Sequence, residues 1–270
     1  MGYDRLKGKV AFVTGGGSGI GRAIARSLAE EGAALCVSGR NRENLDSAVA
    51  EFEPLGARAL VAPMDIRVEK DVVAAVQQCV DAFGGVDILV NNSGIGGPTK
   101  YVWDLTLDEW NEVIAVDLTG SMLASREVLK HMVPGGRGGS ILVIGSEGGR
   151  SGDGRSGYPM RAPYCSAKMG LIGLTETLAR ECGPYGIRVN CITPAAVRGE
   201  RFVRMIGGRA TAAGISYEEA LASEMKMYSL RRPAEESEIG AVAVFLASDE
   251  AAAITGQTVP VNCGMNMWGL

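Results

Sequence analysis

The sequence contains little of what several common catalytic sites need. It has one histidine, His131, so a Ser-His-Asp triad or a metal site built on histidines has almost no material. Its six cysteines include no CxxC pair, and we expect reduced, mostly buried thiols in a cytoplasmic protein. We therefore expect no metal, and any acid–base chemistry has to use another type of residue.

An excess of basic charge and a long hydrophobic run are also missing. The chain has 27 basic and 31 acidic residues and a net charge of −4, which gives no electrostatic attraction to nucleic acid or to an anionic membrane. No apolar run approaches the roughly 20 residues that span a bilayer. The first ten residues, MGYDRLKGKV, lack the apolar stretch of a secretory signal. We expect a cytoplasmic globular protein that binds neither nucleic acid nor a membrane.

Short apolar runs alternate with stretches of helical periodicity along the 270 residues, and no Pro/Ser-rich linker divides them. The runs are apolar on both faces, which indicates a parallel sheet buried between helices. We predict one α/β domain, 1–270, with a doubly wound, Rossmann-like sheet of seven strands. The predicted strands are Lys9–Gly15, Ala33–Gly39, Ala57–Asp65, Val86–Asn92, Gly139–Ser146, Ile187–Thr193 and Gln257–Asn262. The predicted helices are Ile20–Glu31, Arg42–Leu55, Glu69–Phe83, Leu107–Met132, Pro163–Cys182 and Ser237–Ser248.

One long segment without a strand pattern, Ala195–Glu236, separates the sixth strand from the last helix. A segment of this length is either functional or disordered, and its helical periodicity around Glu218–Met227 favours a function. We expect it to act as a substrate lid, and below we call it the lid segment.

A glycine cluster, TGGGSGIG (Thr14–Gly21), stands between the first strand and the first helix. Glycines allow a tight turn and a close approach to a diphosphate, which the helix N-terminus then binds with its unpaired N–H groups. The strand before it and the helix after it make this a stronger signal than glycines alone.

Two tyrosines, Tyr158 and Tyr164, lie near the middle of the chain. A free phenol titrates near 10, so it needs help to exchange protons at neutral pH. Residues four apart share one helix face, and an ammonium group there stabilises a phenolate. Tyr164 has Lys168 at this spacing, whereas Tyr158 has Ala162 and lies among prolines. We predict that Tyr164 is the acid–base residue and that Tyr158 packs or lines the substrate site.

Several motifs, in order along nearly the whole chain, resemble those of the short-chain dehydrogenase/reductase family. They are TGxxxGIG, NNSG (Asn91–Gly94), YCSAK (Tyr164–Lys168), ITPAAV (Ile192–Val197) and ITGQTVPVN (Ile254–Asn262). The resemblance implies a reversible hydride transfer between NAD(P)(H) and a secondary alcohol/ketone pair. It also implies a homotetramer. The cofactor contacts that it implies are Gly15, Ser18, Gly19, Ile20, Gly21, Arg40, Asp65, Ile66, Asn91, Gly94, Tyr164, Lys168, Pro194 and Val197.

The end of the second strand carries Gly39 and Arg40, where an acidic residue would bind the ribose hydroxyls of NAD. A guanidinium without a carboxylate favours the 2′-phosphate of NADP(H). NAD(H) remains the alternative, with Arg40 facing solvent or stacking on the adenine.

The family places a serine at the end of the fifth strand to hold the substrate oxygen. Ser146 fits, and Ser151 in the glycine-rich stretch Gly149–Gly157 is its rival; we prefer Ser146 because a strand end is rigidly positioned. We therefore expect substrate contacts at Ser146 and Tyr164, as the resemblance implies, and at Tyr158 as a residue that lines the site. At the family's fourth catalytic position, usually an asparagine, this chain has Asp117.

Three functional questions stay open at this level. The first two are whether the chain is a carrier-linked 3-oxoacyl reductase, and whether it senses nucleotides without turnover. The third concerns the arginines of the lid segment and of the preceding insertion, which either bind a carboxylate, sulfonate or polyhydroxyl substrate or form a solvated rim. The residues concerned are Arg198, Arg201, Arg204, Arg150, Arg155 and Arg161.

Overall fold

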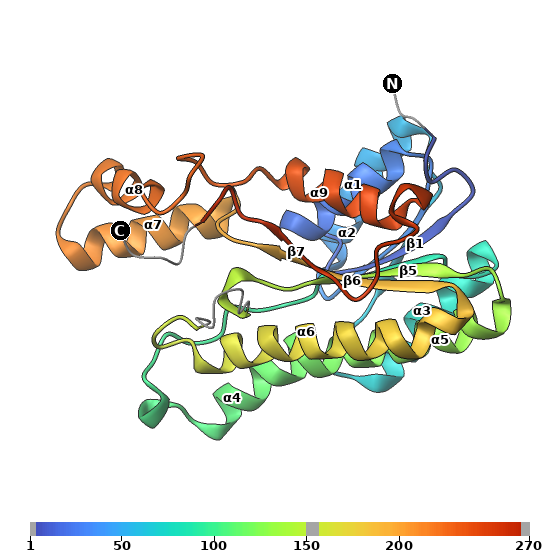
Figure 1. The fold of residues 1–270 in the computed structure, drawn as a ribbon, viewed down its shortest axis with the longest axis horizontal. Coiled ribbons are helices and arrows are strands. Elements are labelled where there is room, and N and C mark those ends of the chain that lie inside the picture. Colours follow the sequence, from blue (N-terminus) through green and yellow to red (C-terminus); the bar gives the residue numbers. More distant parts are fainter. Residues whose placement is uncertain (1–3, 150–156, 266–270) are drawn as a thin grey trace.

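The computed structural model describes residues 4–149 and 157–265, and these are arranged around one parallel sheet of seven strands (Figure 1). The strands are β1 (Val10–Thr14), β2 (Ala34–Gly39), β3 (Ala59–Pro63), β4 (Ile88–Asn91), β5 (Gly139–Ile144), β6 (Ile187–Pro194) and β7 (Thr258–Val261). Their order in the sheet is β3-β2-β1-β4-β5-β6-β7. The predicted Rossmann-like fold is confirmed.

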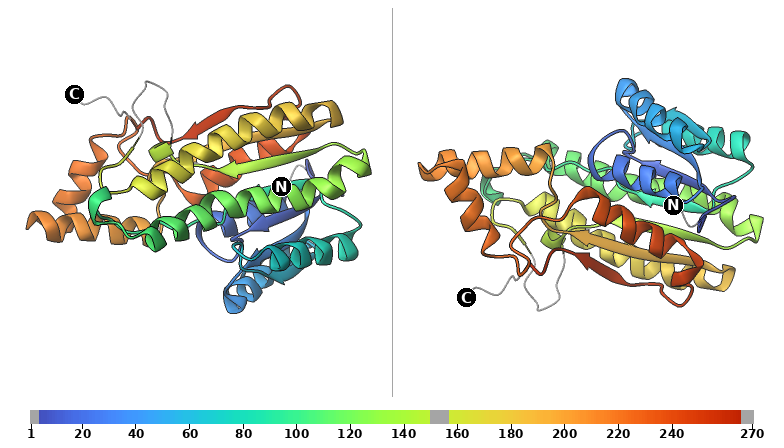
Figure 2. Two further views of the ribbon diagram at one scale, coloured as in Figure 1. Left: turned by 90° about the horizontal axis from the view of Figure 1, so that it is seen from below. Right: turned by 90° about the horizontal axis from the view of Figure 1, so that it is seen from above.

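Helices cover both faces of the sheet, as Figure 2 shows from below and from above. They are α1 (Gly19–Glu30), α2 (Arg42–Phe52), α3 (Glu69–Phe83), α4 (Leu107–Val113), α5 (Gly120–Gly135), α6 (Ala162–Cys182), α7 (Glu200–Ala213), α8 (Tyr217–Met225) and α9 (Glu236–Ala247). Within the described residues, no helix is long and apolar enough to cross a membrane.

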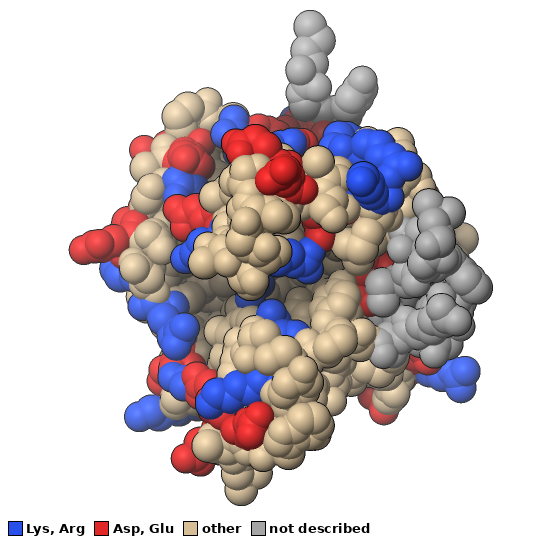
Figure 3. Space-filling model, turned by 90° about the vertical axis from the view of Figure 1, so that its left-hand side faces the viewer, with Lys and Arg blue, Asp and Glu red and all other residues tan. Residues whose placement is uncertain are grey.

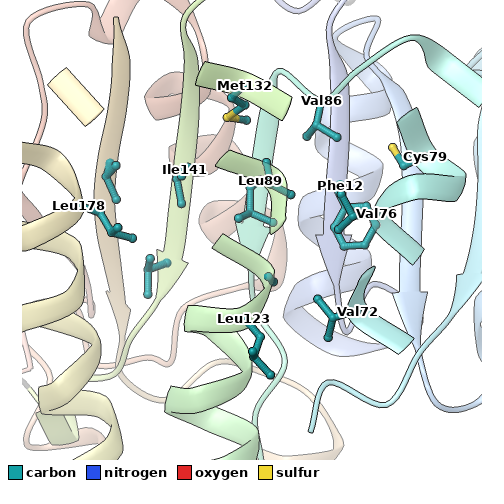
Figure 4. Packing of buried hydrophobic residues seen from close by; sticks show 14 of the residues in the cluster. Phe12, Val72, Val76, Cys79, Val86, Leu89, Leu123, Met132, Ile141 and Leu178 are labelled. Carbon is teal, nitrogen blue, oxygen red and sulfur yellow. The ribbon is translucent and has the colours of Figure 1, made fainter. Parts of the chain in front are cut away.

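Each face of the sheet has its own apolar core. On one face, strand residues such as Phe12, Leu89 and Ile141 pack against Val76 of α3 and Leu123 of α5 (Figure 4). On the other face, α1, α2 and α9 cover a second cluster of buried residues. Strands buried on both faces explain why their sequences are almost continuously apolar.

Helices α1 and α9 lie against each other because a glycine lets them approach. A Cβ atom on Gly240 would overlap the Ser27 hydroxyl oxygen and would stand 3.0 Å from the Ser27 Cβ. The close contact fixes α1, and hence the glycine-rich turn before it, against the sheet.

Two elements differ from the sequence prediction. The single helix predicted over Leu107–Met132 is α4 and α5 joined by a π-helical turn, Ile114–Thr119. The lid segment contains two helices, α7 and α8, where periodicity had indicated only the second. Helix α7 buries Phe202, Ile206 and Ala210 in a small separate core. Both lid helices extend beyond the sheet at one end of the molecule (Figure 1).

The order of the strands determines where a ligand can bind. The chain runs outward from β1 to β2 and β3, and then in the opposite direction from β4 to β7. In open parallel sheets, ligands bind beyond the carboxyl ends of the strands where this direction reverses. The loops after β1 and β4, which carry the glycine cluster and the NNSG motif, meet at this point.

Candidate active site

An open cleft of about 2620 Å³ runs over the carboxyl ends of the strands, from the glycine-rich turn to the lid helices. It gathers most of the predicted site residues. Those that line it are Gly15, Ser18, Gly19, Ile20, Gly21, Arg40, Asp65, Ile66, Gly94, Asp117, Ser146, Tyr158, Tyr164, Lys168, Pro194 and Val197.

The glycine-rich turn forms a tight cradle at one end of the cleft. Gly15 has φ +66°, which a side chain disfavours, and a Cβ there would stand 2.9 Å from the Asn92 side-chain nitrogen. A Cβ on Gly21 would overlap the same nitrogen and the Gly15 carbonyl oxygen. Ser18 precedes α1 without capping it, so the first N–H groups of the helix are available to a ligand. This backbone fits the diphosphate of a dinucleotide.

Asn92 links the glycine-rich turn to the end of β4. Sequence reasoning named the neighbouring Asn91 instead and missed Asn92. Its amide donates to the carbonyl oxygens of Thr14 and Gly15 at 3.1 and 3.2 Å. Asn91 is buried, donates to Ser125 at 2.8 Å and does not line the cleft. Side chains of neighbouring residues in a strand point to opposite faces of the sheet. This alternation could have indicated from the sequence that only one of the two asparagines faces the glycine-rich turn. A cofactor contact of Asn91 stays a prediction.

Beyond the ends of β2 and β3, the cleft is lined by the charged side chains of Arg40 and Asp65. Asp65 pairs with Arg67, and these hydrogen bonds lower the pKa of Asp65 to about 2, with a smaller contribution from the charge of Arg40. Arg40 is exposed on the cleft wall, whereas Arg42 pairs with Asp46 and does not line the cleft. Arg40 is thus the guanidinium that is available to contact a cofactor in this part of the cleft.

Tyr164 and Lys168 stand one turn apart on α6, as their spacing predicts. Pro163 is one of the first residues of this helix, where proline needs no N–H partner. The ammonium of Lys168 lies 5.7 Å from the centre of the Tyr164 ring. The same ammonium donates to the carbonyl oxygen of Ile144, at the end of β5, at 3.1 Å. The buried Lys168 is therefore held in place from the sheet.

Asp117 places a carboxylate beside this lysine. Its Oδ2 atom lies 3.5 Å from the Lys168 ammonium, and its Oδ1 atom accepts from the Ile95 N–H at 2.7 Å. Asp117 is fully buried in the π-helical turn between α4 and α5, and such turns often occur at functional sites. Burial raises its pKa, while the charge of Lys168 acts in the opposite direction. Gly94 leaves room for the pair, because a Cβ there would stand 3.2 Å from Oδ2.

Ser146 lines the cleft, although it does not end the strand. β5 ends at Ile144, and Ser146 lies two residues later, where its hydroxyl accepts from the Gly148 N–H at 3.2 Å. Only 9% of the residue is exposed, so its position is fixed. The rival Ser151 lies outside the described residues, as do Arg150 and Arg155.

Tyr158 reaches the cleft from the loop before α6. Its ring packs on Gly148, where a Cβ would stand 2.6 Å from Cε2. Burial raises its pKa, and the nearby Tyr164 adds to this. A phenol that keeps its proton suits a wall of the cleft.

The lid helices are joined by a polar contact to a buried carboxylate, that of Glu224. Arg209 of α7 pairs with Glu224 of α8, and the Tyr228 hydroxyl donates to the same carboxylate at 3.3 Å. Tyr228 is 1% exposed, and burial raises its pKa to about 12. Sequence reasoning gave Tyr228 no role, because this contact depends on how α7 and α8 pack against each other.

Known proteins resemble the chain along nearly its whole length. Residues 15–266 match the model of a family described as enoyl-(acyl carrier protein) reductase. A short-chain dehydrogenase/reductase of Armillaria gallica is 36% identical over 264 residues, which cover 96% of each chain.

Solved structures extend this similarity to the fold. NAD⁺-bound xylitol dehydrogenase has a TM-score of 0.88 and 32% identity, covering 95% of this chain and 98% of the other. A variant of actinorhodin polyketide ketoreductase with NADPH has a TM-score of 0.89 and 31% identity, covering 99% and 100%. The sequence, the fold and the site agree with one conclusion: the chain belongs to the short-chain dehydrogenase/reductase family of oxidoreductases.

Proposed function

We propose that the protein catalyses a reversible hydride transfer between NAD(P)(H) and a secondary alcohol/ketone pair. The observation that carries this proposal is the meeting of Ser146, Tyr164 and Lys168 in a cleft whose other end is the glycine-rich cradle. A cofactor held by the cradle would extend along the cleft toward these side chains. A Cβ on Gly21 would overlap the Asn92 side chain and the Gly15 carbonyl oxygen, so a glycine there allows the tight packing of this turn.

The roles of the side chains follow from their chemistry. A bound nicotinamide would supply or accept the hydride. Ser146 orients the substrate oxygen by a hydrogen bond, and Tyr164 gives its phenolic proton to that oxygen in reduction or takes it in oxidation. The charge of Lys168 stabilises the phenolate that remains. Asp117 touches Lys168 and acts through it, so we propose it as a positioning residue.

We propose NADP(H) as the preferred cofactor. Arg40 supports this, because it lines the cleft and forms no ion pair within the described part of the chain. Gly39 supplies no carboxylate that would repel a 2′-phosphate. The two solved relatives named above were determined with NAD⁺ and with NADPH, so the family as such is compatible with either.

A carrier-linked 3-oxoacyl reduction is the second candidate. It is supported by the description of the matching family model, which names an acyl carrier protein. The two candidates use the same catalytic side chains and differ in what the lid segment binds. Reduction of an acetoacetyl thioester at a kcat/KM at least about tenfold above that of free ketones would favour the second candidate.

Steady-state kinetics of the purified protein test the proposal. A panel of secondary alcohols and ketones is assayed with NADP(H) and NAD(H), following the nicotinamide absorbance. We expect turnover of at least one pair, with kcat/KM for NADP(H) at least about tenfold higher. Binding of NADP(H) without any turnover would support a nucleotide sensor instead.

We also propose that the protein is a cytoplasmic homotetramer. Exposed apolar side chains before and at the start of α4 support an association between copies, since Trp103 is 75% exposed and Leu107 is 72% exposed. Light scattering coupled to gel filtration measures the mass directly, and a monomer would contradict the proposal.

A further inference from the structure

Two guanidinium groups meet at the catalytic end of the cleft. Arg161 immediately precedes α6, and its Cζ atom lies 4.9 Å from the centre of the Tyr164 ring. Arg201 lies in the first turn of α7. Their Nη2 atoms lie 3.2 and 3.0 Å from the position that a Cβ on Gly96 would take. The two positive groups therefore approach the same point beside Tyr164.

Neither group is neutralised by a carboxylate in the described part of the chain. The terminal nitrogen of Arg161 donates to the carbonyl oxygen of Gly96 at 2.7 Å, and its buried Nε atom has no partner. No ion pair of a described residue involves Arg201. Among the other arginines of the lid segment, Arg198 contacts Glu235, Arg209 contacts Glu224 and Arg232 contacts Glu238, whereas Arg204 and Arg231 form no ion pair with a described residue.

The nearest acidic group of the catalytic centre is already occupied. Burial raises the pKa of Asp117 and the charge of Arg201 opposes this weakly, whereas Lys168, 3.5 Å from the Asp117 carboxylate, opposes it more strongly. Two guanidinium groups that face one point without a counter-charge repel each other. A bound anion would remove this repulsion and pair with both.

We propose that Arg161 and Arg201 bind a carboxylate of the substrate, so that the preferred substrates are hydroxy acids and the corresponding oxo acids. The inference rests on the proposed function and names its substrate class. Guanidinium groups suit a carboxylate, because their planar set of donors matches its two oxygens. Figure 3 shows the hollow on this side of the molecule, with Lys and Arg side chains at its mouth.

The position of Arg161 limits the length of the substrate. Its guanidinium lies over the ring of the tyrosine that exchanges the proton with the substrate oxygen. The carboxylate is therefore separated from the reacting carbon by few atoms. A long-chain acid with a distant hydroxyl group does not satisfy both contacts.

The test compares acids with their uncharged esters. The kcat/KM of the whole protein is measured for α-, β- and γ-hydroxy acids, each paired with its methyl ester. We expect at least one acid to exceed its ester by about tenfold or more. Arg201→Gln should abolish this preference and change kcat/KM for the ester less than about threefold, and Arg201→Lys should retain part of it.

A matched control lies three residues earlier. Arg198 is also in the lid segment but does not line the cleft, so Arg198→Gln should leave the acid-to-ester ratio unchanged. Equal rates for acids and esters, or an unchanged ratio in Arg201→Gln, would overturn the inference while the proposed function stands. A raised KM for the cofactor in Arg201→Gln, with an unchanged acid-to-ester ratio, would also overturn the inference and leave the proposed function standing. A lack of turnover with every alcohol would overturn the proposed function, and this inference with it.

Discussion

The ammonium of Lys168 lies 3.5 Å from a carboxylate oxygen of Asp117, and both side chains are buried. The same ammonium lies 5.7 Å from the ring of Tyr164. Lys168 thus stands between an acidic group and the proposed proton donor. A carboxylate so close to the lysine partly cancels the field that the lysine exerts at the phenol.

Replacing Asp117 by asparagine should change the pH dependence of the reaction. We expect the wild-type rate of alcohol oxidation to rise toward alkaline pH, because oxidation requires a base that accepts the hydroxyl proton. Asp117→Asn removes the opposing charge, so the field of Lys168 acts on Tyr164 at full strength and the rise of kcat/KM moves to lower pH. The expected shift is on the order of half to one pH unit.

The pH profiles of both proteins, measured with one alcohol, decide this prediction. The asparagine keeps the shape of the residue and the acceptor for the Ile95 N–H, so the fold is preserved. If the rise of kcat/KM with pH does not shift in Asp117→Asn, or shifts to higher pH, the charge of Asp117 does not affect Tyr164.

Cofactor preference should follow the charge at the end of β2. A side chain at Gly39 has room, because the nearest atoms to its Cβ would be 3.7 Å away on Leu45 and 3.9 Å away on Gly15. Gly39→Asp places a carboxylate near a 2′-phosphate and should shift the ratio of kcat/KM from NADP(H) toward NAD(H) by about tenfold or more.

Two further observations bear on the role of Arg40. Gly39→Asn is the matched neutral control and should change the ratio much less than Gly39→Asp. A wild-type protein that already prefers NAD(H) by more than about tenfold would contradict the proposed role.

Much of this architecture could be predicted from local sequence patterns. Strands buried on both faces have continuous apolar runs, so all seven were predicted. The glycine turn and the Tyr164–Lys168 spacing each lie within one short segment. The π-helical turn was not predicted, because one extra residue in a turn hardly alters the periodicity around Asp117. Helix α7 was missed because two adjacent glycines, Gly207 and Gly208, interrupt its sequence.

Other features depend on contacts between distant segments. Arg161 and Arg201 belong to different elements, and their meeting over Gly96 requires the folded chain. Asn92, and not Asn91, contacts the glycine-rich turn, and the sequence alone does not say which of the two side chains points there. Sequence patterns named Arg161, Arg201 and the NNSG motif, but they could not place these residues relative to one another.

The packing of α1 on α9 should be sensitive to a single methyl group. Gly240→Ala places a Cβ against Ser27 and the neighbouring carbonyl oxygen of Ala23, which is 3.3 Å away. We expect a loss of about 1–3 kcal/mol in the free energy of unfolding, measured by urea denaturation.

Gly173→Ala in α6 is the control for Gly240→Ala. Nothing lies within 4 Å of its Cβ, so it should be neutral or gain up to about 1 kcal/mol. Equal stability of both variants would contradict the described contact.

The central claim is that Tyr164, and not Tyr158, exchanges the proton with the substrate. Its most direct test is the turnover of Tyr164→Phe and Tyr158→Phe with one alcohol, together with cofactor binding measured by fluorescence titration. Because Tyr164→Phe removes only the phenolic hydroxyl, it should lower kcat by about a hundredfold or more and leave the cofactor Kd within about threefold. Tyr158→Phe should keep most of the activity. An inactive Tyr158→Phe beside an active Tyr164→Phe would contradict the account.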